Sequence, residues 1–379
     1  MSLKRPNNRK VSSKRPYKII ISGGGTGGHI YPAIAIANEL KEMHPDIDIL
    51  FVGAQGRMEM QKIPEAGFRI IGLPISGIQR SLSLRNLKFP FKLLASLWRS
   101  GKILKEFNPD VAVGVGGFAS GPLLYMATRK NIPTLIQEQN SYAGLTNKLL
   151  AKKVDVICVA YENLEKYFPY QKIILTGNPV REDIERAGSR VDQAVEFFSF
   201  SKQQKTILVV GGSLGARNIN DSIYEHIQEI IDADIQLVWQ TGAIYFDEFQ
   251  SKMERHPKER IRIFKFLKEM DLAYAMADLV ISRAGAIAIS ELCIVRKPVI
   301  FVPSANVAED HQTKNAQALV ETDAALIIPD SQAKDRLVKE ALELLDQNDK
   351  LEKLANNIGK LARPDAGKAI AGEILKLVA

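Results

Sequence analysis

The sequence predicts an α/β protein of two Rossmann-like domains, whose parallel sheets face each other across a cleft. Short runs rich in Ile and Val alternate with helical patterns along most of the chain. This alternation stops between residues 181 and 204 and then begins again. A length of 379 residues also exceeds what one ordinary hydrophobic core holds, so two domains are expected.

The first half contains seven candidate strands, separated by helical stretches such as residues 32–43 and 145–153. Strand and helix in alternation favour a doubly wound parallel sheet. Ligands bind such sheets outside the carboxyl ends of the strands, so the loops that follow the strands are expected to line the cleft. The expected strands span residues 17–22, 46–53, 68–72, 110–116, 133–137, 154–160 and 172–177.

The second half repeats the pattern with six candidate strands and ends in a stretch that can form an amphipathic helix. The segment "TGNPVRED" marks the expected boundary between the halves. We therefore predict a basic tail over residues 1–16, a first domain over 17–180, a second domain over 181–363 and a last helix over about 364–379. The expected strands of the second domain span residues 205–210, 235–242, 261–266, 277–285, 297–303 and 324–329.

The net charge of +8 is unevenly distributed. Residues 1–18 carry seven Lys or Arg and no acidic residue, which is typical of a disordered basic arm. Residues 19–178 carry 18 basic and 12 acidic side chains, whereas the remainder carries 26 basic and 31 acidic ones. A basic first half and an acidic second half suggest domains that face different partners.

Export and membrane insertion are not indicated by the sequence. No run of 18 apolar residues occurs, and the polar first 16 residues contain no apolar segment typical of a secretory signal. The two cysteines, Cys158 and Cys293, are far apart and each lies within an apolar run. This pattern predicts buried, reduced thiols in a cytosolic protein without disulfides.

Three loops share one construction, in which an apolar strand is followed by a glycine cluster and a helix: residues 22–29, 114–122 and 211–217. Such loops bring backbone N–H groups and a helix N-terminus close to a phosphate. The first loop also fits the dinucleotide-binding pattern of glycines, but the next strand ends in Gly53 and Ala54 without an acid to hold a ribose. A nicotinamide or flavin cofactor is therefore disfavoured, and no Walker loop occurs.

His29 follows two glycines at the mouth of the predicted cleft, with Pro32 close behind, where helices tend to begin. We interpret it as a group aimed at a ligand. A satisfied polar group at a helix start is the alternative.

The motifs taken together resemble the MurG family of glycosyltransferases (family 28). They are "GGGTGGHIYPAIAIANEL", "GVGGFASGP", "QEQNSYAGLTNK", "TGNPVR", "GGSLGARNIN", "SRAGAIAISEL" and "EDHQTKNAQAL", and they run in order from about residue 18 to the C-terminus. Single motifs are shared with relatives that include plastid galactolipid synthases.

The resemblance implies the GT-B fold, with donor bound mainly by the second domain, acceptor by the first, and the last helix packed back on the first domain. It implies an inverting transfer of GlcNAc from UDP-GlcNAc to the lipid-linked MurNAc-pentapeptide called lipid I, giving lipid II for peptidoglycan. The implied enzyme has no cofactor or metal. It lies peripherally on the cytoplasmic face of the bacterial inner membrane, where other cell-wall synthesis proteins are further partners.

The resemblance also assigns residues. Glu291 would accept hydrogen bonds from the ribose hydroxyls, and His29 is the leading base, although it could instead organise the acceptor loop with Thr26 and Asn140. Arg181 would neutralise charge on the departing UDP. His311 is a second histidine at the site. The donor- and substrate-binding residues implied are Thr26, Gly27, Gly28, Asn140, Arg181, Ser213, Leu267, Ala286, Ile287 and Gln312.

Residues 66–105 contain eight Lys or Arg and no acidic residue, interleaved with large apolar side chains. This pattern suits docking on an anionic bilayer, which a lipid-linked acceptor requires. An ordinary amphipathic helix on the sheet is the alternative, and nucleic acid is disfavoured because no reading motif accompanies the charge. The expected docking residues are Arg85, Lys88, Phe89, Phe91, Lys92, Trp98 and Arg99.

Two alternatives stay open at the level of sequence. One is a related glycolipid synthase that uses another UDP-sugar. The other is a UDP-GlcNAc epimerase-like enzyme of similar shape, which would need no basic and apolar docking surface.

Overall fold

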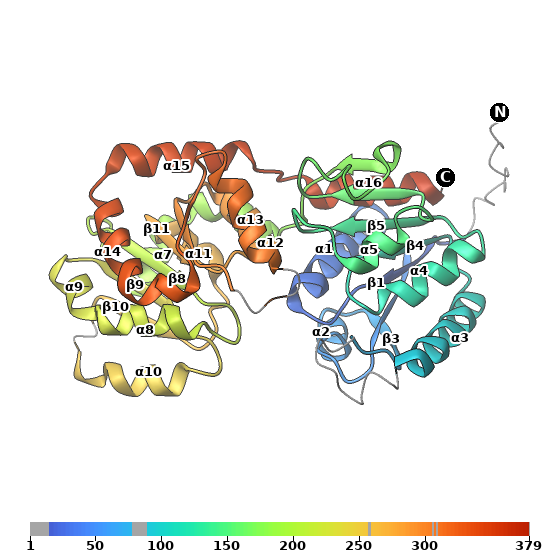
Figure 1. The fold of residues 1–379 in the computed structure, drawn as a ribbon, viewed down its shortest axis with the longest axis horizontal. Helices are drawn as coiled ribbons and strands as arrows, with labels where there is room; N and C mark the ends of the chain where they lie inside the picture. The colour runs from blue at the N-terminus through green and yellow to red at the C-terminus, as the bar shows by residue number, and fades with distance from the viewer. Residues whose placement is uncertain (1–14, 78–88, 257–258, 305–306, 308–309, 379) are drawn as a thin grey trace.

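The computed structural model describes residues 15–77, 89–256, 259–304, 307 and 310–378, and it contains two lobes, each built on one parallel β-sheet (Figure 1). The first sheet has seven strands in the order β3-β2-β1-β4-β5-β6-β7. They are β1 (Lys18–Ser22), β2 (Asp48–Ala54), β3 (Arg69–Leu73), β4 (Val111–Gly114), β5 (Thr134–Glu138), β6 (Val156–Val159) and β7 (Ile173–Leu175).

The second sheet has six strands in the order β10-β9-β8-β11-β12-β13. They are β8 (Thr206–Val210), β9 (Gln236–Gln240), β10 (Ile261–Phe264), β11 (Leu279–Ser282), β12 (Val299–Phe301) and β13 (Leu326–Ile327). Every pairing in both sheets is parallel, and each strand expected from the sequence has its counterpart. The predicted fold class is therefore confirmed.

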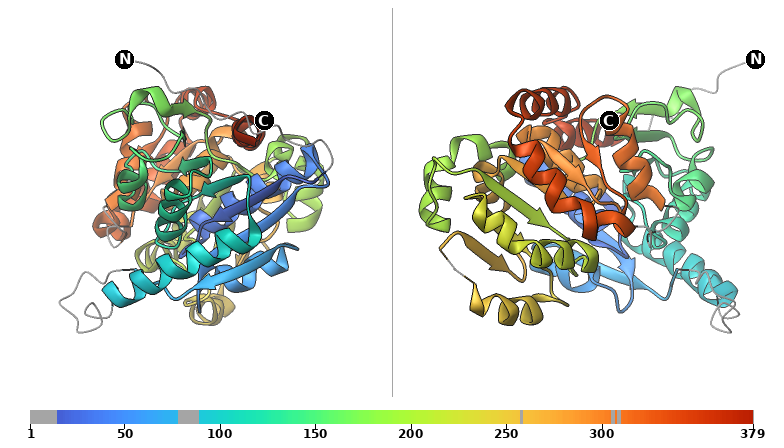
Figure 2. Two further views of the ribbon diagram at one scale, coloured as in Figure 1. Left: turned by 90° about the vertical axis from the view of Figure 1, so that its right-hand side faces the viewer. Right: turned by 60° about the vertical axis from the view of Figure 1, so that its left-hand side comes forward.

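Helices flank both sheets, and α3 lies on the outer side of the first lobe (Figures 1 and 2). The first lobe contains α1 (Gly27–Met43), α2 (Glu59–Glu65), α3 (Phe89–Phe107), α4 (Ser120–Arg129) and α5 (Leu145–Leu150). The helices that follow along the chain are α6 (Glu182–Glu185), α7 (Val191–Phe198), α8 (Arg217–Glu225), α9 (Ile227–Asp232), α10 (Phe246–Lys252), α11 (Met270–Met276), α12 (Ala286–Val295), α13 (His311–Val320), α14 (Ala333–Leu345), α15 (Asn348–Lys360) and α16 (Ala366–Val378).

The strand sequences are apolar at consecutive positions because both faces of each sheet are covered. In β1, Ile19 and Ile21 pack in the cluster beneath α1, while Ile20 packs in the cluster on the other face. This alternation follows from the two-residue period of a strand. Strand β1 is thus packed on both faces of the sheet, so the loop that follows it begins at a well-ordered strand end.

The last helix, α16, lies against α1 in the first lobe. Its Ile370 and Ile374 are fully buried in the same cluster as Ile19 and Ile30. The preceding α15 packs against α12 and α14 of the second lobe. The chain therefore passes between the lobes twice, once after β7 and once before α16.

Candidate active site

The glycine loop between β1 and α1 rests on a buried carboxylate. Glu59 is fully buried at the start of α2. Its Oε2 accepts a hydrogen bond from the N–H of Gly25, and its Oε1 accepts one from the N–H of Ala54, each with a length of 3.0 Å. A Cβ on Gly24 would lie 2.2 Å from Glu59 Oε1, so only glycine allows this close approach. The loop is thereby tied to the end of β2.

The sequence offers no acid at the end of β2 to hold a ribose, and the nearby Glu59 does not change this. Glu59 follows that strand by five residues, and its carboxylate is turned inward to the loop's own N–H groups. A carboxylate so engaged does not face a ribose. A dinucleotide site at this loop therefore remains disfavoured, because the nearby carboxylate binds N–H groups of the protein itself.

Replacement of Glu59 by Ala is expected to destabilise the first lobe by about 2–4 kcal/mol, because two buried N–H groups lose their acceptor. Chemical denaturation with the near-UV signal as readout measures the change. Glu65→Ala on the same helix is the matched control, since Glu65 is exposed and pairs with its neighbours Gln61 and Lys62. Equal stability of the Glu59→Ala protein and the wild type would contradict the role of this carboxylate.

His29 is the third residue of α1, and its Nδ1 lies 3.0 Å from Gln139 Oε1 at the end of β5. Its ring fits against the loop after β4 because Gly116 has φ +92° and a Cβ there would lie 2.7 Å from Nδ1. The helix begins at Gly27, so Pro32 lies inside α1 and not at its start, contrary to the expectation. The ring bonds to Gln139, whereas no hydrogen bond joins it to Thr26 or Asn140 among the described contacts.

Burial lowers the pKa of His29 below its ordinary value. The negative charge of Glu138 and the bond to Gln139 oppose this shift, while His311 from the second lobe adds to it. A pKa below that of free imidazole keeps His29 neutral at pH 7. The ring is therefore in the state in which it can accept a proton.

The two lobes contribute different glycine loops to the cleft. The loop over residues 22–29 and the loop after β4 meet at His29 in the first lobe. The third loop lies in the second lobe, where the carbonyl of Ser213 accepts a hydrogen bond of 2.9 Å from the N–H of Ala243. The side chain of Ser213 is exposed ahead of α8.

Helix α12 begins at Ala286 after Gly285, with Ala286 and Ile287 half-buried in its first turn and no acidic residue there. A helix N-terminus of this kind attracts phosphate. One turn further on, Glu291 accepts a hydrogen bond of 3.0 Å from the Tyr274 hydroxyl. Burial raises the pKa of the Glu291 carboxyl, and Arg181 and Tyr274 oppose that shift.

Four other predicted site residues make hydrogen bonds or ion pairs within the protein. Arg181 lies 3.6 Å from Asp183 and is about half exposed, so it remains accessible. The Leu267 side chain is buried and its N–H donates a hydrogen bond to Gln240 Oε1. Gln312 accepts from the N–H of Ser304, and Asn140 donates to Glu138.

Asn140 also lies at the contact between the lobes. Its partner there is Asn315, which the sequence did not single out. Asn315, fully buried in α13, donates to Asn140 Oδ1 over 3.1 Å. The same amide accepts from both the N–H and the hydroxyl of Ser141, over 3.0 and 2.9 Å. The Asn315 amide thus binds the loop after β5 to the second lobe.

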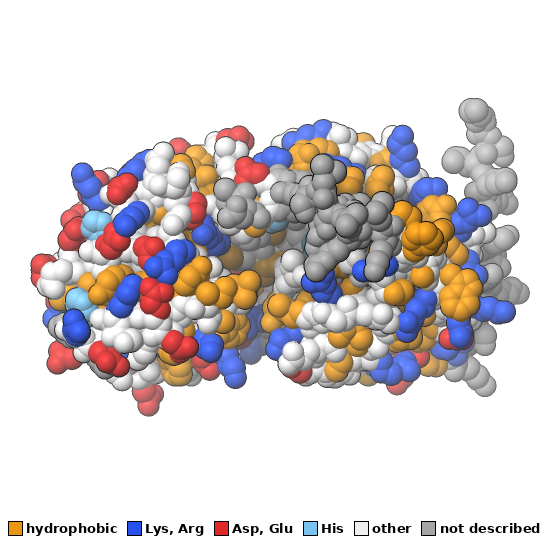
Figure 3. Space-filling model, turned by 60° about the horizontal axis from the view of Figure 1, so that its bottom comes forward, with side chains coloured by type: hydrophobic (Ala, Val, Ile, Leu, Met, Phe, Trp, Pro, Cys, Tyr) orange, Lys and Arg blue, Asp and Glu red, His pale blue; other side chains and the backbone are white. Residues whose placement is uncertain are grey.

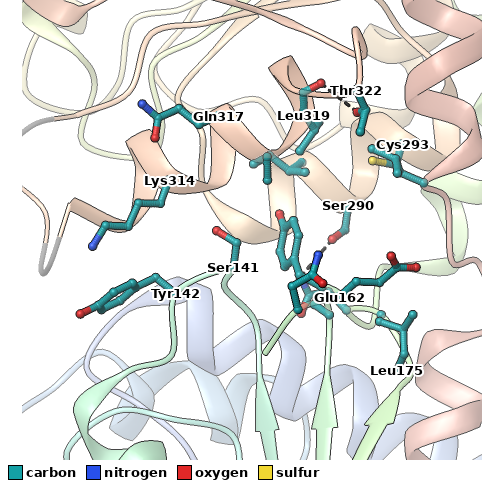
Figure 4. A pocket seen from close by; sticks show the side chains of 18 of the residues that line it. Ser141, Tyr142, Glu162, Leu175, Ser290, Cys293, Lys314, Gln317, Leu319 and Thr322 are labelled. Carbon is teal, nitrogen blue, oxygen red and sulfur yellow. Dashed lines mark hydrogen bonds between the residues drawn. The ribbon is translucent and has the colours of Figure 1, made fainter. Parts of the chain in front are cut away.

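A cavity of about 530 Å³ lies between the lobes, next to this contact, and Ser141 lines it (Figure 4). Lys314 on α13 lies over the ring of Tyr142 at 3.3 Å from its centroid. Ile289, Ser290 and Cys293 of α12 line the cavity, whereas Glu291 of the same helix does not. None of the predicted donor residues lines it, so this cavity is separate from the predicted donor site.

Both cysteines are buried and unbridged, as the sequence predicts. Burial raises the pKa of the Cys158 and Cys293 thiols to about 12. Among the described residues, no group of three or more His, Cys, Asp or Glu side chains is placed to hold a metal ion.

The outer face of α3 carries exposed apolar side chains: Phe91 is 75% exposed, Leu94 64% and Trp98 73%. Lys92 is exposed and donates to Ser76, while Phe89 and Arg99 are half-buried. Figure 3 shows the first lobe, at its right, with many Lys and Arg and apolar groups at its edge, and the second lobe with more Asp and Glu.

Arg85 and Lys88 lie outside the described residues. Within the described part of the chain, no helix has the length and apolar character needed to span a bilayer.

Two parallel α/β lobes, with glycine loops and a helix N-terminus after their strands, form the GT-B fold. The chain matches the glycosyltransferase family 28 N-terminal domain over residues 19–159 and the family's C-terminal domain over residues 206–370. It belongs to the MurG family of these enzymes.

Relatives of known sequence and structure agree with that assignment. The chain is 54% identical, over 96% of its length and 99% of the relative, to the UDP-N-acetylglucosamine–N-acetylmuramyl-(pentapeptide) pyrophosphoryl-undecaprenol N-acetylglucosamine transferase of Parabacteroides distasonis. The crystal structure of Acinetobacter baumannii MurG matches with a TM-score of 0.77 and 27% identity, covering 95% of this chain and all of that one. A UDP-GlcNAc 2-epimerase from Neisseria meningitidis shares the fold alone, with a TM-score of 0.65 and 17% identity over 95% of this chain and all of that one.

Proposed function

We propose that this protein transfers GlcNAc from UDP-GlcNAc to the MurNAc hydroxyl of lipid I, giving lipid II for peptidoglycan. The observation that carries the proposal is the 54% identity, over 96% of the chain, to an enzyme whose name states this reaction. The site supports it, because the first lobe offers a neutral histidine and the second lobe a helix N-terminus for a diphosphate.

The donor binds mainly to the second domain, residues 181–363. The N–H groups at Ala286 and Ile287, with Ser213 and Arg181, hold the diphosphate. Glu291 accepts from the ribose hydroxyls with the lone pairs that Tyr274 leaves open. The Leu267 carbonyl meets the uracil edge, and the amides of Gln312 and Asn140 reach the sugar hydroxyls; for Asn140 this requires exchanging a bond to Glu138 or Asn315.

The acceptor binds to the first domain, residues 17–180, together with α16 (Ala366–Val378). Thr26 and Gly28 are exposed at the N-terminus of α1, and with Gly27 they offer N–H groups to the acceptor diphosphate. The acceptor hydroxyl attacks the anomeric carbon as the bond to UDP breaks, and the α linkage becomes β. His29 takes the hydroxyl proton, and the α12 dipole and Arg181 stabilise the charge on UDP.

The test incubates the purified protein with UDP-GlcNAc and a lipid I analogue. Release of UDP together with a GlcNAc–MurNAc disaccharide is the expected result. A second reaction without acceptor detects conversion of UDP-GlcNAc to its C2 epimer UDP-ManNAc or, where water also displaces UDP, to free ManNAc and UDP, the products of epimerases. A third replaces the donor with UDP-galactose or UDP-glucose. Turnover only in the second or third reaction would overturn the proposal.

The protein is proposed to act peripherally on the cytoplasmic face of the inner membrane, with the outer face of α3 against the bilayer. Phe91, Leu94 and Trp98 are exposed there beside Lys92 and Arg99. Apolar side chains that enter the bilayer, with basic groups worth about 1 kcal/mol each near anionic lipid, suit this role. No cofactor is required, and further cell-wall synthesis proteins are expected as partners.

Phe91→Ser with Trp98→Ser is expected to weaken binding to phosphatidylglycerol vesicles at least about 10-fold, because two large side chains lose their burial in the bilayer. Vesicle flotation measures the bound fraction. Ile244→Ser is the control, since Ile244 is 65% exposed in the second lobe. Unchanged binding by the double variant would place the docking surface elsewhere.

A further inference from the structure

A neutral histidine has two tautomers, and only one ring nitrogen in each can accept a proton. For His29 the choice decides which nitrogen serves as the base. Nδ1 faces Gln139 at 3.0 Å, so an acceptor hydroxyl can reach only Nε2. Nε2 is basic when Nδ1 carries the hydrogen.

The orientation of the Gln139 amide fixes that tautomer. Gln139 is buried, and its Nε2 donates to the carbonyl oxygen of Val115 over 2.8 Å and to Gln137 Oε1. A backbone carbonyl can only accept, so the amide nitrogen must face Val115. The amide oxygen then faces His29, and His29 must donate from Nδ1.

A chain of buried amides holds Gln139 in this orientation. Gln137 Nε2 donates to Asn178 Oδ1 over 2.9 Å, and Asn178 Nδ2 donates to the Gln139 carbonyl and to Ser290 Oγ, each over 3.1 Å. Ser290 Oγ in turn donates to the Ala286 carbonyl over 3.0 Å. Every donor in this chain faces an acceptor. If the Gln139 amide were rotated by 180°, its oxygen would face the Val115 carbonyl oxygen and Gln137 Oε1.

The charged groups around His29 do not compete for Nδ1. Glu138, on β5, is fully occupied by bonds from Gly144 N–H, the Asn147 amide and both nitrogens of Asn140, so it acts on His29 through its charge. His311, on α13, acts in the opposite sense. Gln139 Oε1 lies 3.0 Å from Nδ1, and the Val115 carbonyl, which can only accept, is a second hydrogen-bond partner of the ring.

We propose that Gln139 is a positioning residue that holds His29 in the Nδ1–H tautomer and so presents an unprotonated Nε2 to the acceptor hydroxyl. The tautomer follows from the hydrogen bonds alone. Its use in catalysis rests on the proposed function. The amide chain also runs from His29 to the first turn of α12, so base and donor helix share one network.

The direct test is ¹⁵N NMR of the imidazoles, which separates the two tautomers by the shifts of Nδ1 and Nε2. His29→Asn assigns the signal of His29. Wild-type protein is expected to show the Nδ1–H form, and Gln139→Met is expected to shift His29 toward the Nε2–H form. A wild-type His29 in the Nε2–H form, or an unchanged tautomer in Gln139→Met, would overturn the proposal.

Kinetics give the second readout. Gln139→Met is expected to lower kcat about 5-fold with KM for UDP-GlcNAc unchanged, since one hydrogen bond of about 1 kcal/mol biases the tautomer. The hydrogen bond to Gln139 raises the pKa of His29, so Gln139→Met is also expected to move the acid limb of the rate profile to lower pH. An acid limb that stays in place in Gln139→Met would contradict the positioning role.

Gln236→Met is the matched control for lost stability. Gln236 is equally buried and donates to two carbonyls and a threonine, but it lies on β9, away from the cleft. It is expected to lower the melting temperature without changing kcat or the His29 tautomer. If no GlcNAc is transferred while Gln139→Met still shifts the tautomer, the proposed function fails and the positioning of His29 stands.

Discussion

Replacement of His29 by Ala is expected to lower kcat by about 10²–10⁴-fold while leaving the affinity for UDP within about twofold. The acceptor hydroxyl then loses the group that takes its proton, whereas the diphosphate site in the second lobe is unchanged. Steady-state rates with the lipid I analogue and calorimetric UDP binding measure the two effects separately. His44→Ala is the control, since His44 is exposed at the end of the same helix.

The rate of the wild-type enzyme is also expected to depend on pH in a defined direction. A base must be unprotonated to act, and burial places the pKa of His29 below that of free imidazole. The rate should therefore remain level around pH 7 and fall as the pH drops through that lowered pKa. His29→Ala should abolish this acid limb. A near-normal rate in His29→Ala would exclude the residue as the base.

Replacement of Glu291 by Ala is expected to weaken UDP-GlcNAc binding about 10–100-fold, because ribose hydroxyls bonded to a charged acceptor contribute about 1.5–3 kcal/mol. Calorimetric titration with UDP measures the loss. Tyr274→Phe is the comparison: it removes the hydroxyl bonded to Glu291 but leaves the carboxylate, so a smaller change is expected. Equal donor affinity in Glu291→Ala and wild type would rule out the ribose role.

Donor binding should also depend on pH through this carboxyl. Burial raises the pKa of Glu291, and only the ionised form accepts two hydroxyl hydrogen bonds. UDP affinity is therefore expected to weaken as the pH falls toward that raised pKa. The Glu291→Gln protein should lose this dependence, and retaining it would assign the titration to another group.

The local pattern of apolar residues was sufficient to predict the strands of both sheets. The strands are runs of Ile and Val such as Ile19–Ile21, bounded by turns, and each lies where the sequence predicts it. The position of His29 after a glycine loop was equally visible, because loop and helix start are neighbours in the chain. The family followed from motifs that run in order along the whole chain.

The partners of the site residues were decided by the tertiary structure. Glu59 bonds to Gly25, which lies 34 residues away, His29 to Gln139 at a separation of 110, and Asn315 to Ser141 at 174. No periodicity or local propensity encodes a hydrogen bond between elements so far apart in sequence. Such bonds exist because buried polar groups must find partners once the sheets and helices have packed. The sequence by itself determined which strands and loops form; packing decided which carboxylate closes the glycine loop and which amide orients the histidine.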